Sequence, residues 1–307
     1  MNVESEEDNE EYSEIYDWDT LLKKKDSYEK ITSIMATPYN NHALLAEFPS
    51  DVNELDILRK IYLENKEIFF FPPHMVKFIN LVFFSFNNFV LAEYPKFIDN
   101  FINLKSLSLR KTKLKVLPES IGKLVKLKEL YLCENELENL PDSITNLKDL
   151  ILLRLDRNNL SKLPDEIGKF DKLLELDLRN NVLTELPESI GNLTNLEELK
   201  LRLNKIKYIP STIGNLTKVY INFSHNKLTG LPLSIKNVSR IDIFPSSYDD
   251  FDKISPDCEY LQIERLNVPL RNLPIYIKEI RLTKPKIQIG DIKVPFGCEL
   301  YVNNVLQ

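Results

Sequence analysis

A large apolar residue followed by proline recurs along this chain at a fixed interval. The prolines are Pro49, Pro72, Pro95, Pro118, Pro141, Pro164, Pro187 and Pro210, each 23 residues after the last, and Pro232 follows after 22. Self-similarity at a period of about 20–50 residues indicates a solenoid, in which each unit stacks on its neighbours. The interval therefore constrains the fold strongly. It leaves function to surface residues that the repeat does not fix.

Apolar residues within one unit follow two different periods. In the unit that begins at Leu117, Leu130 and Leu132 alternate with polar residues, as in a strand with one buried face. The segment from Pro118 to Leu127 has apolar spacings of three and four, which indicates a helical turn or short helix. Proline suits its first turn. Stacked units would then place a parallel sheet on one face and helical turns on the other.

An asparagine follows each strand of the regular units, where the chain bends inward. These residues are Asn135, Asn158, Asn181, Asn204 and Asn226. A buried amide must be hydrogen-bonded. We therefore expect these side chains to satisfy backbone groups of the bend and to stack as a structural ladder, with no catalytic role.

The clearest unit, LPESIGKLVKLKELYLCENELENLP, resembles the 23-residue leucine-rich repeat of the intracellular Ras-group type. The resemblance is specific over residues 94–232 and extends in degenerate form back to Phe48. It implies an α/β fold, a right-handed leucine-rich-repeat solenoid. A curved parallel sheet of about 12 short strands would line the concave face, with short helices or turns on the convex face.

The chain divides into four predicted segments. Residues 1–19 carry nine acids and no base, which is typical of a disordered tail, although an acidic interaction motif is the alternative. Helical spacing that includes Tyr28, Ile31 and Ile34 predicts a helical N-terminal cap over 20–47. The 23-residue repeats cover 48–232. Shorter, irregular repeats cover 233–307, because inward strand pairs continue at intervals of 19–22 residues as far as Leu300 and Val302.

Several features bear on location. The N-terminus is acidic and polar, unlike a signal peptide. Cys133, Cys258 and Cys298 are far apart and odd in number, which favours free thiols in a reducing compartment. The aromatic stretch 68–91 holds two prolines and three asparagines and keeps the repeat phase, so we expect no membrane span. These features predict a cytoplasmic, intracellular protein.

Outward residues of successive strands should form rows across the concave face, about 4.8 Å apart. The candidate partner-binding residues are Ser108, Arg110, Tyr131, Arg154, Asp156, Asp177, Arg179, Lys200, Arg202 and Asn222. Tyr131, Arg179 and Arg202 are the favoured anchors, because Tyr and Arg are enriched at binding hot spots. Acids and bases are mixed, whereas nucleic acid would favour a basic face. The same charges could instead keep the sheet soluble.

No catalytic constellation is evident. His42, His74 and His225 are scattered, no Cys/His spacing suits zinc, and no nucleophile motif or phosphate loop occurs. We expect no metal, no cofactor and no enzymatic activity. The sequence predicts a non-catalytic protein–protein interaction module, an adaptor or scaffold, whose partner is a protein of unknown identity.

The alternative is a structural or self-assembling solenoid. The last predicted strand, Leu300–Val302, lies five residues from the end of the sequence, which leaves no room for a substantial cap. An uncovered edge strand invites pairing with another chain. This alternative predicts a homo-oligomer through the C-terminal edge. An enzyme-associated effector is less favoured.

Overall fold

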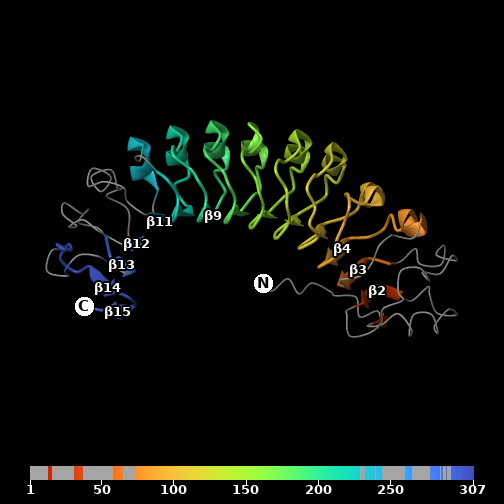
Figure 1. Cartoon of the computed structure of the whole chain (residues 1–307), viewed down its shortest axis with the longest axis horizontal. Coiled ribbons are helices and arrows are strands. Elements are labelled where there is room, and N and C mark those ends of the chain that lie inside the picture. The colour runs from red at the N-terminus through yellow and green to blue at the C-terminus, as the bar shows by residue number, and fades with distance from the viewer. Residues whose placement is uncertain are drawn as a thin grey trace, which may run out of the picture.

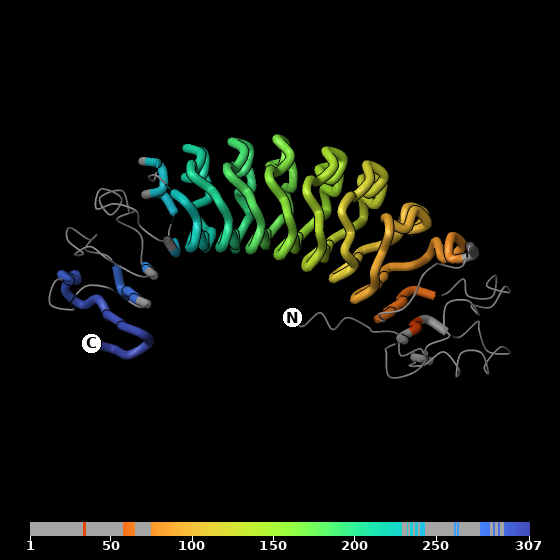
Figure 2. Tube along the Cα trace, viewed as in Figure 1, coloured from red at the N-terminus to blue at the C-terminus, as the bar shows by residue number. Residues whose placement is uncertain are grey.

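The computed structural model describes residues 13–15, 31–36, 58–64, 73–228, 232–238, 240–243, 260–264, 277–283, 285, 288 and 292–307. Within them, one sheet of 15 strands runs in sequence order from β1 to β15. The sheet curves into an arc, with the strands on its inner side and short helices on its outer side over the central repeats (Figure 1). In Figure 2 the chain makes one coil per repeat along this arc. The arrangement confirms the predicted leucine-rich-repeat solenoid.

Neighbouring strands from β1 to β14 are parallel. Their bounds are β1 (Ser13–Ile15), β2 (Ile31–Ala36), β3 (Lys60–Glu64), β4 (Phe83–Asn87), β5 (Ser106–Ser108), β6 (Glu129–Tyr131), β7 (Leu152–Arg154), β8 (Glu175–Asp177), β9 (Glu198–Lys200), β10 (Tyr220–Asn222), β11 (Arg240–Ile243), β12 (Tyr260–Glu264), β13 (Glu279–Thr283) and β14 (Glu299–Val302). The central leucines pair in register: Leu130 with Leu153, and Leu153 with Leu176. All three are fully buried, because alternate residues of a strand face the same side.

The outer side carries short 3₁₀ helices. They are η3 (Pro73–Lys77), η4 (Lys96–Asn100), η5 (Glu119–Lys123), η6 (Asp142–Asn146), η7 (Ile167–Lys169), η8 (Glu188–Asn192), η9 (Ser211–Asn215) and η10 (Leu233–Asn237). The recurring proline lies one residue before most of these helices, with extended backbone, rather than in the first turn. From this position the proline carbonyl oxygen accepts a hydrogen bond from the backbone N–H three residues later. One example is the bond from Ile121 to Pro118, at 3.1 Å.

Close packing between these helices explains a recurring glycine. A Cβ atom on Gly191 would stand 2.2 Å from the carbonyl oxygen of Thr212 in the next repeat. Real Cβ atoms do not approach oxygen so closely, so the helices can stack at this spacing only with glycine between them.

The described buried residues form one continuous hydrophobic core along the solenoid. Leucine and isoleucine dominate its central part. Near β4 the core is aromatic: the Phe84 ring contacts Phe97 and Phe101 with centroids 6.1 and 5.4 Å apart, and Phe86 stacks on Phe89.

The N-terminal strands differ from the expected helical cap and disordered tail. Ile31–Ala36 is strand β2, which pairs with β3 and aligns Ile34 with Ile61. The helix predicted over 20–47 is therefore wrong for these residues, because β-branched Ile31, Thr32 and Ile34 favour a strand. Ser13–Ile15 is strand β1 on β2, so predicted disorder is wrong there too. The remaining residues of 1–19 and 20–47 lie outside the described part.

The C-terminal edge also differs from expectation. Strand β15 (Val305–Leu306) pairs antiparallel with β14, so Leu300–Val302 is not the outer strand. Asn303 and Asn304 join the two strands with φ of 51° and 66°. Positive φ at both residues is what a tight two-residue hairpin turn needs, and asparagine tolerates it. The prediction of an uncovered Leu300–Val302 edge is therefore wrong.

Candidate interaction face and asparagine ladder

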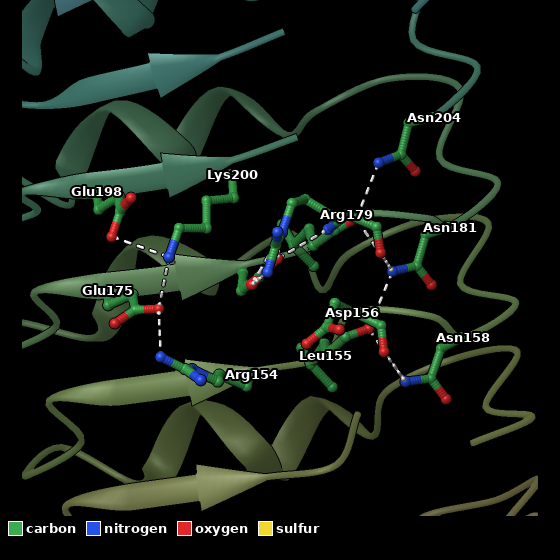
Figure 3. Close-up of polar contacts among 12 residues, drawn as sticks. Arg154, Leu155, Asp156, Asn158, Glu175, Arg179, Asn181, Glu198, Lys200 and Asn204 are labelled. Carbon is green, nitrogen blue, oxygen red and sulfur yellow. Dashed lines mark hydrogen bonds and ion pairs between the residues drawn. The ribbon is translucent and has the colours of Figure 1, made fainter. Parts of the chain in front are cut away.

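The five asparagines that follow β6–β10 tie each repeat to the one before it. The Asn181 side-chain nitrogen donates to the carbonyl oxygens of Leu155 in the preceding repeat and Leu178 in its own, both at 3.0 Å. Its oxygen accepts the backbone N–H of Leu160 at 3.0 Å. Asn135, Asn158, Asn204 and Asn226 make the corresponding bonds. Figure 3 shows three successive members.

The residue before each ladder asparagine has left-handed backbone. The set is Lys111, Glu134, Arg157, Asn180, Leu203 and His225, with φ between 54° and 60°; at Lys111 the following residue is Thr112 instead of asparagine. This conformation is uncommon for residues other than glycine and is best tolerated by asparagine. Sequence reasoning missed this row. The signal was its fixed place in the repeat, one residue before the ladder.

Three strands in the centre of the concave face share one charge network. Glu175 on β8 pairs with Arg154 on β7 at 3.2 Å and accepts a hydrogen bond from Lys200 on β9 at 2.9 Å (Figure 3). Lys200 also pairs with Glu198 at 2.9 Å. Burial disfavours the charged form of Lys200, but the hydrogen bonds to Glu198 and Glu175 outweigh it and raise its pKa. The ammonium group is thus held between two carboxylates.

A second pair lies beside this network. Asp177 on β8 is fully buried, and the Arg179 guanidinium donates to its two carboxylate oxygens at 2.9 and 2.5 Å. The backbone N–H of Arg179 adds a bond at 3.1 Å. Arg179 therefore neutralises a buried charge, a structural role beside its predicted role as an anchor. Burial, and then the nearby charge of Asp177, raises the pKa of Asp156 on the adjacent repeat.

The other predicted residues occupy either side of this centre. Ser108 is buried and donates to Asn87 at 2.7 Å, while exposed Arg110 pairs with Glu134. Tyr131 is half-buried, 6.0 Å beneath the Arg154 guanidinium. Toward β11, Asn222 donates to Asp242 at 2.8 Å. Arg202 is exposed beyond β9.

The face offers little reactive chemistry among the described residues. Burial raises the pKa of the Cys133 thiol to about 11, so it remains protonated and is a poor nucleophile at neutral pH. Across the same residues, no three His, Cys, Asp or Glu side chains gather closely enough to hold a metal ion. In this part of the chain, no helix has the length and apolar character needed to cross a membrane.

Family comparisons agree with this architecture. A family model described as a leucine-rich repeat region matches residues 91–182, and one described as a leucine-rich repeat matches residues 172–193. The chain is a leucine-rich repeat protein. The matched residues include the ladder asparagines Asn135, Asn158 and Asn181, and Arg154 and Glu175 of the charge network. Folds of this family typically serve protein–protein interaction and are generally non-catalytic. The Ras-group subtype stays a prediction.

Solved structures share the fold of this leucine-rich repeat protein. A leucine-rich repeat protein of Leptospira interrogans, LIC12759, is 25% identical with a TM-score of 0.70, and the match covers 89% of this chain and 72% of that one. The plant peptide hormone receptor RGFR1, in complex with RGF2, is 23% identical with a TM-score of 0.66, covering 89% and 47%. InlJ of Listeria monocytogenes is 17% identical with a TM-score of 0.61, covering 86% and 61%. The chain thus spans less than two thirds of the last two. A search of curated proteins found no match.

Proposed function

We propose that this leucine-rich repeat protein is a non-catalytic adaptor or scaffold that binds a protein partner on the concave face of β5–β10. The supporting observation is the network in which Glu175 joins Arg154 and Lys200 across three strands. Its members are fixed by one another, yet the Arg154 side chain remains 41% exposed. A face whose side chains are already ordered loses less entropy on binding.

Solubility alone gives a poorer account of this network. Isolated charges would keep the sheet soluble equally well, and exposed ion pairs add only about 0–1 kcal/mol of stability. Neither solubility nor stability explains why the Glu175 carboxylate is shared between Arg154 and Lys200, which lie on the strands to either side of it. The similar plant receptor is described in complex with RGF2, which supports a binding role for this kind of fold. We also propose a cytoplasmic location, from the free thiols of Cys133 and Cys298.

The test is affinity capture with the full chain and two triple variants. One variant changes the concave face through Tyr131→Ala, Arg154→Gln and Arg202→Gln. Arg179 is kept, because its removal would strand the buried charge of Asp177. The control carries Lys96→Gln, Lys123→Gln and Glu188→Gln, exposed residues of the outer helices.

A partner that is retained by the wild type and the control but lost by the concave variant supports the proposal. Loss in the control with retention in the concave variant would move the binding surface to the convex side. Circular dichroism of each variant verifies that the fold is intact.

Self-assembly is the second candidate. Val305 and Leu306 of β15, the outer described strand, are 62% and 55% exposed. An exposed apolar edge strand can pair with the same strand of another copy. Sedimentation equilibrium over a wide concentration range tests this candidate, and a monomer at every concentration would exclude it.

A further inference from the structure

One cation on the concave face differs from its neighbours. The strand rows from β5 to just beyond β9 carry five bases: Arg110, Arg154, Arg179, Lys200 and Arg202. Four of them have a carboxylate partner on the face. Arg202 is exposed, and within the part of the chain that the structure describes its guanidinium has neither an ion pair nor a hydrogen bond.

The adjacent repeats do not compensate this charge. The backbone N–H of Asn180 donates to the carbonyl of Arg202, and Leu203 donates to the carbonyl of Ser224, so these loops lie side by side. The equivalent residues of the two neighbouring repeats are Arg179 and Ser224. Arg179 is already committed to Asp177, and serine carries no charge. Exposed Lys205 and Lys227 follow on the same two loops and strengthen the positive potential.

The residue that follows Arg202 is also exceptional. Leu203 occupies the left-handed position before the ladder, with φ of 60°, and is 40% exposed. The same position holds polar residues in the other repeats: Lys111, Glu134, Arg157, Asn180 and His225. Asparagine tolerates this left-handed backbone better than leucine does. Because the Leu203 side chain is exposed, it also contributes less to folding stability than a buried leucine would. Because the left-handed backbone recurs in these repeats, what sets Leu203 apart is its side chain, an exposed apolar group where the other repeats have polar ones.

We infer that Arg202 and Leu203 together form the anchor of the docking surface. The occupant is a peptide segment of a partner protein that carries a carboxylate beside a large apolar side chain. Arg202 binds the carboxylate through two parallel N–H bonds, and Leu203 covers the apolar group. This assignment rests on the proposed function and specifies the chemistry of the partner.

Selection from a random-peptide display library on the immobilised full chain tests the chemistry. The expected consensus has Asp or Glu beside a large apolar residue. A consensus that is basic or lacks an acid, or no consensus, overturns the inference. A synthetic peptide of residues 1–12, which are acidic, is measured in parallel. If that peptide binds more tightly than the selected peptides, the occupant is the chain's own segment and the assignment to a partner protein is wrong.

Fluorescence anisotropy with the selected peptide then tests the residues. We expect Arg202→Gln and Leu203→Asn each to weaken binding about tenfold or more, as hot-spot substitutions do. Leu203→Asn places the residue found at Asn180 into the same backbone, so the variant should unfold at the same or a higher temperature. Lost affinity with retained stability separates docking from a structural role. Arg157→Gln is the control, because Arg157 is an exposed cation at the same edge with a partner, Glu134 at 3.9 Å.

The variants also separate this inference from the proposed function. If Tyr131→Ala and Arg154→Gln weaken peptide binding while Arg202→Gln and Leu203→Asn do not, the concave face binds but the anchor is wrong. If none of the four changes binding, both proposals fail. Equal losses in Arg157→Gln and Arg202→Gln would show a general attraction to positive charge and overturn the assigned anchor.

Discussion

The repeats around β4 and β5 complete the same bend by different chemistry from the repeats around β6–β10. After β6–β10, an asparagine amide bonds to backbone groups of two repeats. After β5 the position is Thr112, and after β4 it is Phe89, whose ring stacks on Phe86 with centroids 3.5 Å apart. The bend can therefore be completed either by a hydrogen-bonded amide or by a buried aromatic ring. The amide joins neighbouring repeats by directional bonds, whereas Phe89 is buried and stacks on a ring of its own repeat.

The concave surface changes at the same place. Ser85 and Ser108 on β4 and β5 are buried and connect through Asn87 in a neutral hydroxyl–amide network. From β7 to β9 the face is charged and its members are paired. Around β4 and β5 the solenoid thus combines an aromatic core with a neutral network of serine and asparagine. From β7 to β9 it combines the asparagine ladder with a charged face.

The largest effect should come from breaking the ladder. Asn181→Ala leaves the carbonyls of Leu155 and Leu178 and the N–H of Leu160 without their side-chain partner in a buried site. We expect the free energy of unfolding to fall by about 3–5 kcal/mol. Urea unfolding measures it. Asn159→Ala is the matched control, exposed and one residue beyond Asn158, and should change stability by less than about 0.5 kcal/mol. Equal losses in the two variants would contradict the ladder's role.

A smaller loss of stability should follow from weakening the Phe86–Phe89 stack. Phe89→Leu keeps an apolar side chain and removes the stack on Phe86, so unfolding should become easier by about 1–2 kcal/mol. Phe296→Leu alters a fully exposed ring and should leave stability unchanged. If both variants behaved alike, the stack would have no part in holding β4.

Placing a ladder asparagine at position 112, where the chain has threonine, should give a modest gain in stability. The Thr112 hydroxyl donates to Asn135 at 2.8 Å and lies 3.3 Å from the carbonyl of Leu109. Thr112→Asn supplies a second donor, which can reach the preceding repeat as Asn135 reaches Leu109 at 2.7 Å. We expect about 1 kcal/mol of added stability, seen as a higher melting temperature. A lower temperature would show that the ladder cannot extend next to Phe89.

The smallest effect concerns the charged face. Because burial and Asp177 raise the pKa of Asp156 in the folded state, its contribution to stability is present below the unfolded pKa of about 3.9 and is lost as pH rises through the folded value. Asp156→Asn should therefore be more stable at pH 7 by about 0.5 kcal/mol, since solvent screens a partly exposed group. The difference should shrink as pH falls and disappear well below the unfolded pKa of about 3.9, where Asp156 is protonated in both states. Thermal unfolding of both proteins from pH 7 down to acidic pH measures this difference in stability. If the difference stayed constant over that pH range, the pKa of Asp156 would not be raised in the folded state.

The fixed stride and the inward strand pairs were enough to predict the solenoid. Even in the shorter repeats, the predicted pairs align, as Ile241 with Leu261 and Leu261 with Ile280. The reason is physical: alternate apolar residues bury one face of a strand whatever the length of the return segment. The helix predicted over 20–47 is wrong at Ile31–Ala36, because β-branched Ile31 and Ile34 favour a strand although their spacing of three also fits a helix.

The site was less predictable. The sequence placed Arg179 and Asp177 on outward rows, but it could not show that one neutralises the other, because side-chain pairing depends on conformations that spacing does not fix. Left-handed backbone at Leu203 was equally hidden. By contrast, Asn303 and Asn304 are a turn signal that the sequence itself carries, because asparagine tolerates the positive φ that this hairpin needs.

The hydrogen bonds of the ladder asparagines join residues at fixed intervals along the sequence. Asn181 bonds to a carbonyl 26 residues before it and to an N–H 21 residues before it, and Asn158 repeats both intervals. Duplication or loss of one whole 23-residue unit in the gene recreates every joint. The 22-residue step from Asn204 to Asn226 also keeps the joint, with both intervals one residue shorter. The array can therefore grow or shrink across generations in whole steps, while the chemistry of each joint stays the same.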